Sequence, residues 1–210
     1  MSTHARTERL ALCETFLQTG PDAPTLCEGW NSSDLAAHLV LRERRPDAQA
    51  GLYIPGLSAH TTAVQGELAA QPWDELVEQV RSGPPAWNPA RWRVLDEATN
   101  TAEFFVHHED VRRAQPDWKP RVLHPDFEQA LWKACGLAGK LALRSCDVGV
   151  ELVAPAHGRA TGKRGHPSVR VEGPPAELLL FVFGRRDVAQ VDLDGPNDAI
   201  ERLRASSSGF

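Results

Sequence analysis

The chain lacks any long hydrophobic run. No stretch of its 210 residues approaches the roughly 20 apolar residues that a membrane-spanning helix needs. The first residues, MSTHARTERLALCETF, are polar and charged, without the apolar segment of a secretory signal. We therefore expect a cytoplasmic protein that has no membrane partner.

An excess of positive charge is also absent. The chain has 23 Lys and Arg residues against 28 Asp and Glu residues, which gives a formal net charge of -5. Because nucleic-acid binding usually needs a basic face, we expect no nucleic-acid partner. The short basic clusters at 42–45, 112–113 and 159–164 are interpreted as solvated charge on helices and loops.

Cysteine is scarce, and no CxxC pair is present. The four cysteines are Cys13, Cys27, Cys135 and Cys146. Cys13 and Cys135 fall on apolar helix faces, where a reduced cysteine usually packs as a small hydrophobic residue. Cys27 lies in a predicted loop and is the cysteine to test for reactivity.

Helical periodicity dominates the first two thirds of the chain. Apolar stripes include Leu10 and Leu17 in the first helix and Leu141 in the last, and Ser32 or Ser33 offers an N-cap for the second. Four main helices with such stripes suggest an antiparallel bundle. Helices are predicted over residues 5–18, 32–45, 58–69, 72–81, 92–114 and 125–144.

The pattern changes after about residue 147. Strand-like alternation appears at 148–154, 168–173 and 189–195, with helices predicted at 174–186 and 196–204. Residues 157–167 are interpreted as a Gly- and Arg-rich connection. The sequence therefore predicts an all-α domain over 1–145 and a small α+β domain over 146–210, with the boundary near Ser145.

A candidate site comes from three residues. Glu103 and His107 stand four apart in AEFFVHHED, and His38 lies far upstream in SSDLAAHLV. Residues four apart share a helix face, so both could reach one metal ion. A third ligand from another helix would give a His-Glu-His set with an open position, which is typical of catalytic zinc. The alternatives are a surface Glu–His pair and a histidine packed in the core.

Two acidic residues near these ligands also have two interpretations. Asp34 precedes His38 by one turn and would either orient its ring or act as an ordinary first-turn charge. Asp110 follows His107 by three residues and would either lie near the metal or pair with Arg112 or Arg113.

Two stretches, GPDAPTLCEGW followed by SSDLAAHLVLRERRPDA, and AEFFVHHEDVRRA, resemble the mycothiol-dependent maleylpyruvate isomerase family of DinB-like metal-binding bundles. More narrowly, they resemble an actinobacterial branch described only as metal-binding proteins of unknown function. The stretch SVRVEGPPAELLLFVFGRR resembles the family's C-terminal domain, which is similar to sterol-carrier folds. The resemblance runs over nearly the whole chain. It implies a DinB-like antiparallel four-helix bundle followed by a small sterol-carrier-like α+β domain.

The resemblance also implies a set of site residues. His38, Glu103 and His107 would be the metal ligands, with zinc the usual metal and mycothiol the cosubstrate. Arg185, at the end of the C-terminal helix, would face the site and bind a substrate carboxylate. Its other interpretation is a cation placed near a helix C-terminus.

We therefore expect a zinc- and mycothiol-dependent isomerase or S-transferase acting on a small, electrophilic and anionic substrate. Asp110 would assist the chemistry, Trp30 or Trp92 would line the thiol pocket, and basic residues near Arg112 would hold the anion. Zinc lowers the pKa of a bound thiol, so the thiolate could add to the substrate. The alternatives are a metal-dependent hydrolase and a non-catalytic metal- or ligand-binding module. The oligomeric state stays open between a monomer and a homodimer.

Overall fold

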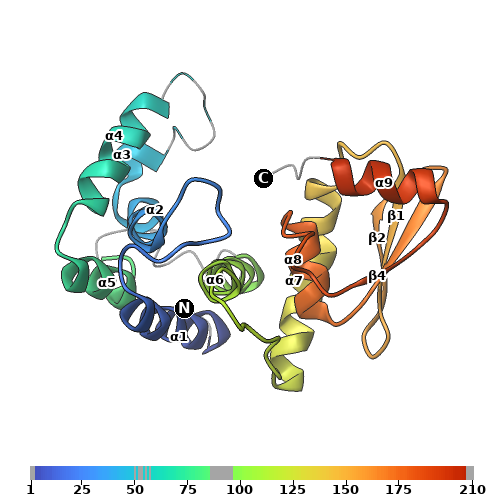
Figure 1. Ribbon diagram of the computed structural model, residues 1–210, viewed down its shortest axis with the longest axis horizontal. Helices are drawn as coiled ribbons and strands as arrows, with labels where there is room; N and C mark the ends of the chain where they lie inside the picture. The colour runs from blue at the N-terminus through green and yellow to red at the C-terminus, as the bar shows by residue number, and fades with distance from the viewer. Residues whose placement is uncertain are drawn as a thin grey trace. The chain divides into compact units, whose positions relative to one another are not determined.

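The computed structural model describes residues 3–49, 58–85 and 97–206, together with residues 51, 54 and 56. These residues fall into two compact units, Met1–Pro120 and Arg121–Phe210 (Figure 1). The first unit is helical, and the second is a small mixed sheet with helices, as the sequence predicts at this level. Trp92 and the predicted beginning of its helix lie outside the described residues.

The helical unit is built around the contacts of α1 with α6 and of α2 with α4 and α5. Its core contains fully buried Leu12, Phe16, Leu35, Leu39 and Leu76. The short α3 is the one described helix of this unit that periodicity does not predict. The helices are α1 Thr3–Thr19, α2 Ser32–Arg44, α3 Pro46–Gln49, α4 Ser58–Ala69, α5 Trp73–Ser82 and α6 Glu97–Arg113.

The buried face of α1 differs from the predicted stripe. Leu10 and Leu17 are 37% and 44% exposed, whereas Glu8 and Arg9 are buried. Arg9 donates to Glu43 Oε2 at 2.7 Å and to the carbonyl of Val80 at 2.6 Å. Because the Glu43 carboxylate and the Val80 carbonyl compensate the charge of the Arg9 guanidinium, the core can accept a charged residue beside the predicted apolar stripe.

The start of α2 is fixed by Asn31 and not by Ser32 or Ser33. The Asn31 side chain accepts from the backbone N–H of Asp34 at 3.0 Å, and the Asp34 carboxylate accepts from the Asn31 N–H at 3.1 Å. This reciprocal capping box satisfies two backbone donors that a helix start otherwise leaves without partners. Asp34 therefore acts as a first-turn charge, the second of its two predicted interpretations.

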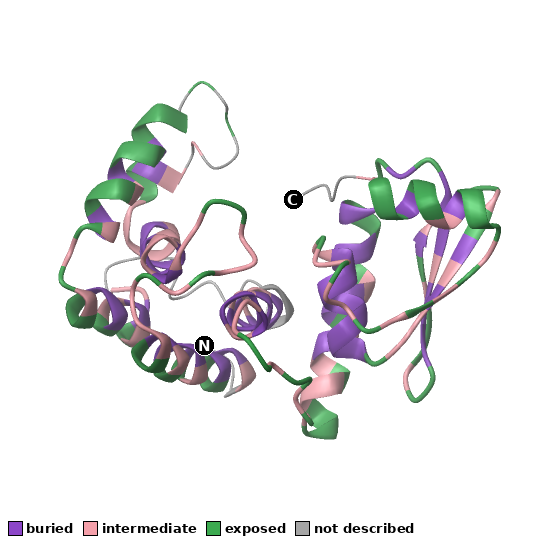
Figure 2. Ribbon diagram, viewed as in Figure 1, coloured by how far each residue is buried: buried purple, intermediate pink, exposed green. Residues whose placement is uncertain are grey.

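In the described part of the second unit, three helices accompany a four-stranded sheet of order β2-β1-β3-β4. Strands β1 and β3 are parallel, whereas β1–β2 and β3–β4 are antiparallel. Figure 2 shows α8 buried along its length, in agreement with its run of buried residues. The elements are α7 Pro125–Ala142, β1 Gly149–Ala154, β2 Gly158–Lys163, β3 Ser168–Glu172, α8 Pro175–Val182, β4 Asp192–Asp194 and α9 Asn197–Ala205.

Strand β2 occupies the segment that was predicted to be a Gly- and Arg-rich connection. Its sequence, GRATGK, has little apolar character because it lies at the edge of the sheet and most of its residues are not buried. A Cβ added at Gly162 would lie 2.6 Å from Leu143 Cδ1, so a glycine permits this close approach.

The division between the units lies at Pro120, whereas the sequence placed the boundary near Ser145. Helix α7 packs against α8 and β2, and therefore belongs with the sheet. Its buried face includes Leu131 and Cys135, but Leu141, predicted to point inward, is 51% exposed.

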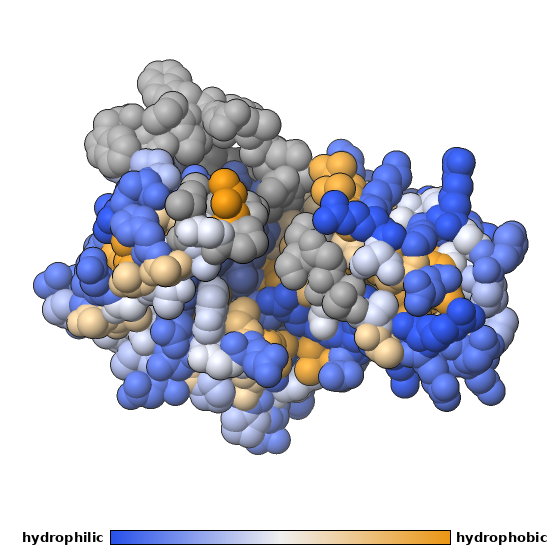
Figure 3. Space-filling model, turned by 90° about the horizontal axis from the view of Figure 1, so that it is seen from above, coloured by the Kyte–Doolittle hydropathy of each residue, from blue (hydrophilic) through white to orange (hydrophobic). Residues whose placement is uncertain are grey.

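The described helices include none that combines the length and the apolar character needed to cross a membrane. In the space-filling view, hydrophilic side chains cover most of the visible face, and apolar side chains form separate small groups (Figure 3).

Candidate metal centre

The three residues singled out by spacing lie together in the helical unit. His38 comes from α2, and Glu103 and His107 come from consecutive turns of α6, with one ligand atom from each within 4.8 Å of the others. His107 Nε2 lies 3.9 Å from Glu103 Oε1. The rings of His38 and His107 are 5.6 Å apart between centroids and meet edge to face. Two helices thus bring two imidazoles and one carboxylate to one point.

His38 is the residue whose electrostatics are most unusual. Burial, aided by the neighbouring His107 and Arg42, lowers the pKa of His38 from 6.5 to about 3. The ring is therefore neutral at pH 7 and has a lone pair for a ligand. Its Nδ1 atom is buried and has no hydrogen-bond partner in the described parts of the chain. The indole of Trp30 lies beside it, with ring centroids 5.1 Å apart.

Arg42 faces the same point and was not foreseen as part of the site. It follows His38 by one helical turn and forms an ion pair with Glu103. The Arg42 and Glu103 side chains are 22% and 15% exposed, so the pair is only partly screened by water. Two residues of α2 therefore face two residues of α6. Arg42 compensates the charge of Glu103, a role that a bound metal would otherwise have.

Asp110 contacts the ring nitrogen of His107 that does not face Glu103. Its side chain is fully buried, and its Oδ2 lies 3.0 Å from His107 Nδ1. Because a carboxylate accepts, Nδ1 is the donor in this contact, and Nε2 is the ring nitrogen that faces Glu103. A carboxylate behind a histidine is the usual support of a metal-ligating imidazole. The contacts of Asp110 place it beside His107, and its predicted role near a metal stays a prediction.

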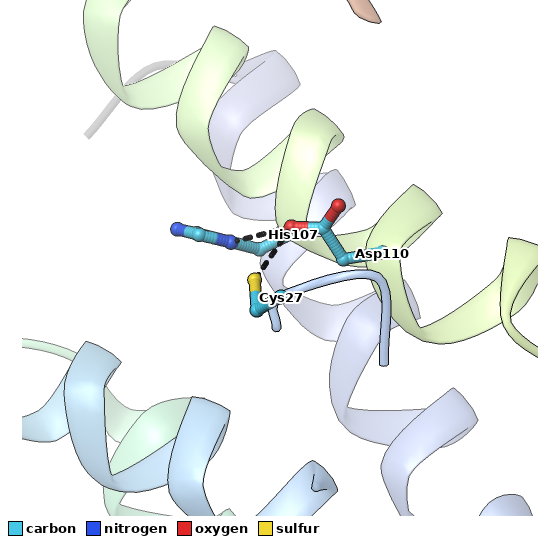
Figure 4. Close-up of side chains that lie close together, drawn as sticks. All are labelled: Cys27, His107 and Asp110. Carbon is cyan, nitrogen blue, oxygen red and sulfur yellow. Dashed lines mark hydrogen bonds and ion pairs between the residues drawn. The ribbon is translucent and has the colours of Figure 1, made fainter. Parts of the chain in front are cut away.

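Cys27 reaches the same carboxylate from a loop. Its Sγ lies 3.2 Å from Asp110 Oδ2 (Figure 4). Cys27, His107 and Asp110 form a second group whose ligand atoms lie within 4.8 Å of one another. The backbone N–H of Leu26 also donates to the carbonyl of Asp110 at 3.0 Å, which ties the loop to α6.

The remaining predicted residues are engaged elsewhere in the structure. Arg112 donates to Glu109 Oε1 at 2.6 Å and to the carbonyl of Lys119 at 3.1 Å. Arg185, in the second unit, donates to the carbonyl of Phe183 at 2.6 Å, just after α8. Both guanidinium groups therefore donate to protein oxygens in this structure. The binding of a substrate carboxylate by either arginine stays a prediction.

His108 forms a buried network that sequence reasoning missed. Its Nδ1 lies 2.7 Å from Glu8 Oε1, and its Nε2 lies 2.8 Å from Thr15 Oγ1. Both partners come from α1, so His108 joins α1 to α6, whereas the neighbouring His107 points toward α2 and the Cys27 loop. The neighbours of Glu8 in the sequence, Thr7 and Arg9, are polar and gave no signal that this carboxylate would be buried.

The residues present fit a divalent transition metal. Within the described ranges, one ring nitrogen of His38 lacks a hydrogen-bond partner, both imidazoles offer a ring nitrogen to the common point, and Glu103 adds a carboxylate oxygen. Two nitrogens and one oxygen suit zinc with an open coordination position, and nickel or iron also accept such ligands. The guanidinium of Arg42 would compete with a metal ion for the Glu103 carboxylate. Metal binding would require Arg42 to share this carboxylate or to release it.

The structure is similar to a crystal structure of the mycothiol-dependent maleylpyruvate isomerase. The TM-score is 0.61 at 17% sequence identity, over 91% of this chain and 90% of that one. A histidine-to-alanine variant of that isomerase gives a TM-score of 0.55 at the same identity and coverage. No family model matches the sequence, and no curated protein matches it either. The predicted resemblance is thus confirmed as a structural similarity, and at this identity it shows the fold alone.

Proposed function

We propose that the helical unit binds one divalent transition metal, with zinc the first choice, through His38, Glu103 and His107. The observation that carries the proposal is the buried Nδ1 of His38, which has no hydrogen-bond partner among the described residues, on a ring that lies beside His107 and within reach of Glu103. An unsatisfied buried nitrogen is unfavourable, and a metal ion would supply its missing partner.

We further propose that the protein is a thiol-dependent isomerase or S-transferase that uses mycothiol. The support is the similarity of fold to the mycothiol-dependent isomerase over nine tenths of the chain, together with an open-sided donor set. In the same proposal, the helical unit is a DinB-like bundle and the second unit is related to sterol-carrier folds. Because fold alone does not define activity, the donor set carries the greater weight.

A bound metal would lower the pKa of a thiol next to it, so that the thiol is held as thiolate at neutral pH. Such a thiolate could add to an electrophilic carbon of the substrate, with the π electrons of the double bond moving onto a conjugated carbonyl. Rotation about the resulting single bond and departure of the sulfur would give the isomer and regenerate the thiolate. In a transferase, the carbon–sulfur bond would remain, and the neighbouring carbon would take up a proton from solvent.

The chain's own residues would orient these reactants. Asp110 holds the His107 ring by its Nδ1–H, and the Trp30 indole forms an apolar wall beside His38. Arg112 or, alternatively, Arg185 is proposed to bind a carboxylate of an anionic substrate, since a guanidinium matches a carboxylate bidentately. Each assignment predicts a higher KM, with a smaller change in kcat, when the arginine is replaced by alanine.

Metal content tests the site. Plasma mass spectrometry of the purified protein should find about one equivalent of zinc, and His38→Ala and His107→Ala should each lose it, because a lost ligand leaves only two donors. His60→Ala is the matched control, since the His60 side chain is 54% exposed and pairs with Asp47 instead. A wild-type protein that takes up no metal after zinc reconstitution contradicts the proposal.

Thiol binding tests the activity. Isothermal titration of the zinc-loaded protein with mycothiol should give saturable binding that disappears from His107→Ala. Metal without thiol binding would refute the thiol chemistry and favour a metal-binding module. Turnover of an ester or amide without any thiol would instead favour the hydrolase alternative, in which the same residues act on activated water.

A further inference from the structure

Cys27, Asp110 and His107 bring sulfur, oxygen and nitrogen donors close together (Figure 4). The His107 nitrogen of this group is Nδ1, whereas Nε2 faces Glu103. We propose that these three residues form a second metal position, which takes thiophilic divalent ions such as Cd²⁺ and is an alternative to the His38, Glu103 and His107 position. The proposal goes beyond the thiol-dependent function and does not need it.

The geometry already resembles a preformed donor set. Cys27 Sγ lies 3.2 Å and His107 Nδ1 lies 3.0 Å from the same Asp110 oxygen. Asp110 is fully buried, and the His107 side chain is only 14% exposed. An ion among the three atoms would therefore replace two hydrogen bonds to one oxygen, and little movement of the side chains is needed.

The loop that carries Cys27 is held in place by several hydrogen bonds. Leu26 N–H donates to the Asp110 carbonyl at 3.0 Å, and Cys27 N–H donates to Thr25 Oγ1 at 3.1 Å. Thr25 Oγ1 in turn donates to the carbonyl of Trp30 at 2.8 Å. Because the backbone on both sides of Cys27 is fixed, its sulfur does not lose much freedom when it binds an ion.

His107 makes the two positions mutually exclusive. Its Nε2 faces Glu103 at 3.9 Å and its Nδ1 faces Asp110 at 3.0 Å. A neutral imidazole has one lone pair and one N–H, so only one of its nitrogens can bind an ion at a time. When Nδ1 carries the proton, Nε2 can bind an ion at the His38, Glu103 and His107 position. When Nε2 carries the proton, Nδ1 can bind an ion at the Cys27 position, and the Nε2–H can donate to Glu103.

Proton balance is simple for the second position. The ion displaces the thiol proton of Cys27, which leaves to solvent, and the His107 proton moves from Nδ1 to Nε2. The ion is then held by one thiolate, one carboxylate oxygen and one imidazole nitrogen. The thiolate and the carboxylate each carry one negative charge. Together they balance the two positive charges of a divalent ion in this mostly buried position. Soft thiolate favours Cd²⁺ over harder ions, whereas two imidazoles and a carboxylate suit zinc.

Cys27 is distinct among the four cysteines, all of which lie in described parts of the chain. The other three are buried, and Cys27 is half-buried. Burial raises the pKa of Cys13 to about 11 and that of Cys135 to about 12, which disfavours the thiolate that a metal needs. These residues therefore serve as built-in controls for thiolate binding.

The test is a Cd²⁺ titration of metal-stripped protein followed by the near-ultraviolet charge-transfer absorption of a cadmium–thiolate bond. The wild type should show a band that saturates at about one equivalent, and His38→Ala should keep it. Cys27→Ser should lose the band and bind Cd²⁺ at least about 10-fold more weakly, since even residues that only support a ligand have effects of that size. Serine keeps a hydroxyl donor toward Asp110, so the loop should remain folded.

Cys135→Ala is the matched control and should keep the wild-type band. Native mass spectrometry with Cd²⁺ and Zn²⁺ together should find a single ion per chain, because His107 is shared. The proposal is overturned by a wild-type protein without the band, by a band that persists in Cys27→Ser or disappears in His38→Ala, or by two ions bound at once. Failure of the zinc site appears separately, as an absence of zinc from wild-type protein that still binds Cd²⁺.

Discussion

Acid should destabilise the metal-free protein through His38, and replacing this residue should remove that part of the effect. The pKa of His38 is 6.5 in an unfolded chain and about 3 in the folded one. Below pH 6.5 the unfolded chain binds a proton at His38, whereas the folded chain does not until about pH 3. The unfolded state therefore holds more protons throughout this window, so stability falls as the pH falls.

The size of the effect follows from linkage. Between pH 7 and about pH 4.5, the two pKa values predict a loss of about 2.5 kcal/mol of unfolding free energy, at roughly 1.4 kcal/mol per pH unit below 6.5. His38→Gln keeps a polar side chain of similar size and cannot titrate. Its stability should therefore fall by about 2.5 kcal/mol less than that of the wild type over the same range.

The assay is urea unfolding of metal-stripped protein at several pH values, followed by the circular dichroism of the helices. The quantity of interest is the wild-type minus variant free energy at each pH, which cancels the titration of all other groups. His38→Asn should show the same flattening, which separates the loss of titration from a local packing effect. Parallel pH profiles for wild type and both variants would refute the burial of a neutral His38 ring.

Three further predictions concern the neighbours of this ring and the start of α2. Arg42→Ala should tighten zinc binding by roughly 1 kcal/mol, because the cation that competes for Glu103 is removed; chelator competition measures this, and weaker binding would contradict it. Asp110→Asn should weaken zinc binding by about 10- to 100-fold in the same assay, since the carboxylate that orients His107 is lost; equal affinity would show that the contact is incidental. Asn31→Ala should lower the unfolding free energy by about 1 kcal/mol in urea, since the capping box loses its acceptor, and an unchanged midpoint would exclude that role.

The ligand-bearing elements could be predicted from sequence because their signals are local. The four-residue spacing of Glu103 and His107 defines a shared helix face. The structure brings the third predicted residue, His38, next to that face from α2. Arg42 could have been found by the same rule, since it follows His38 by one turn. Its pairing with Glu103, by contrast, depends on how two helices cross, which spacing along one helix does not encode.

Features that depend on distant contacts escaped prediction. The edge strand β2 has the composition of a loop, and its strand conformation comes from pairing with β1. Burial of Glu8 depends on His108, which lies on another helix. The position of Cys27 depends on a backbone bond from its loop to Asp110. In each case the deciding partner lies in a different element, where propensity and periodicity carry no information.

The contact between α1 and α6 has a consequence for synthesis on the ribosome. Glu8 and His108 are separated by 100 positions, so the first helix leaves the exit tunnel long before its partner exists. At ordinary elongation speeds of 5–20 residues per second, this delay is roughly 5–20 s. During that interval, the apolar side of α1 is open to chaperones and to other nascent chains. Slow codons before α6 would lengthen this exposure, and a ribosome-bound fragment that ends before α6 should be protease-sensitive in α1.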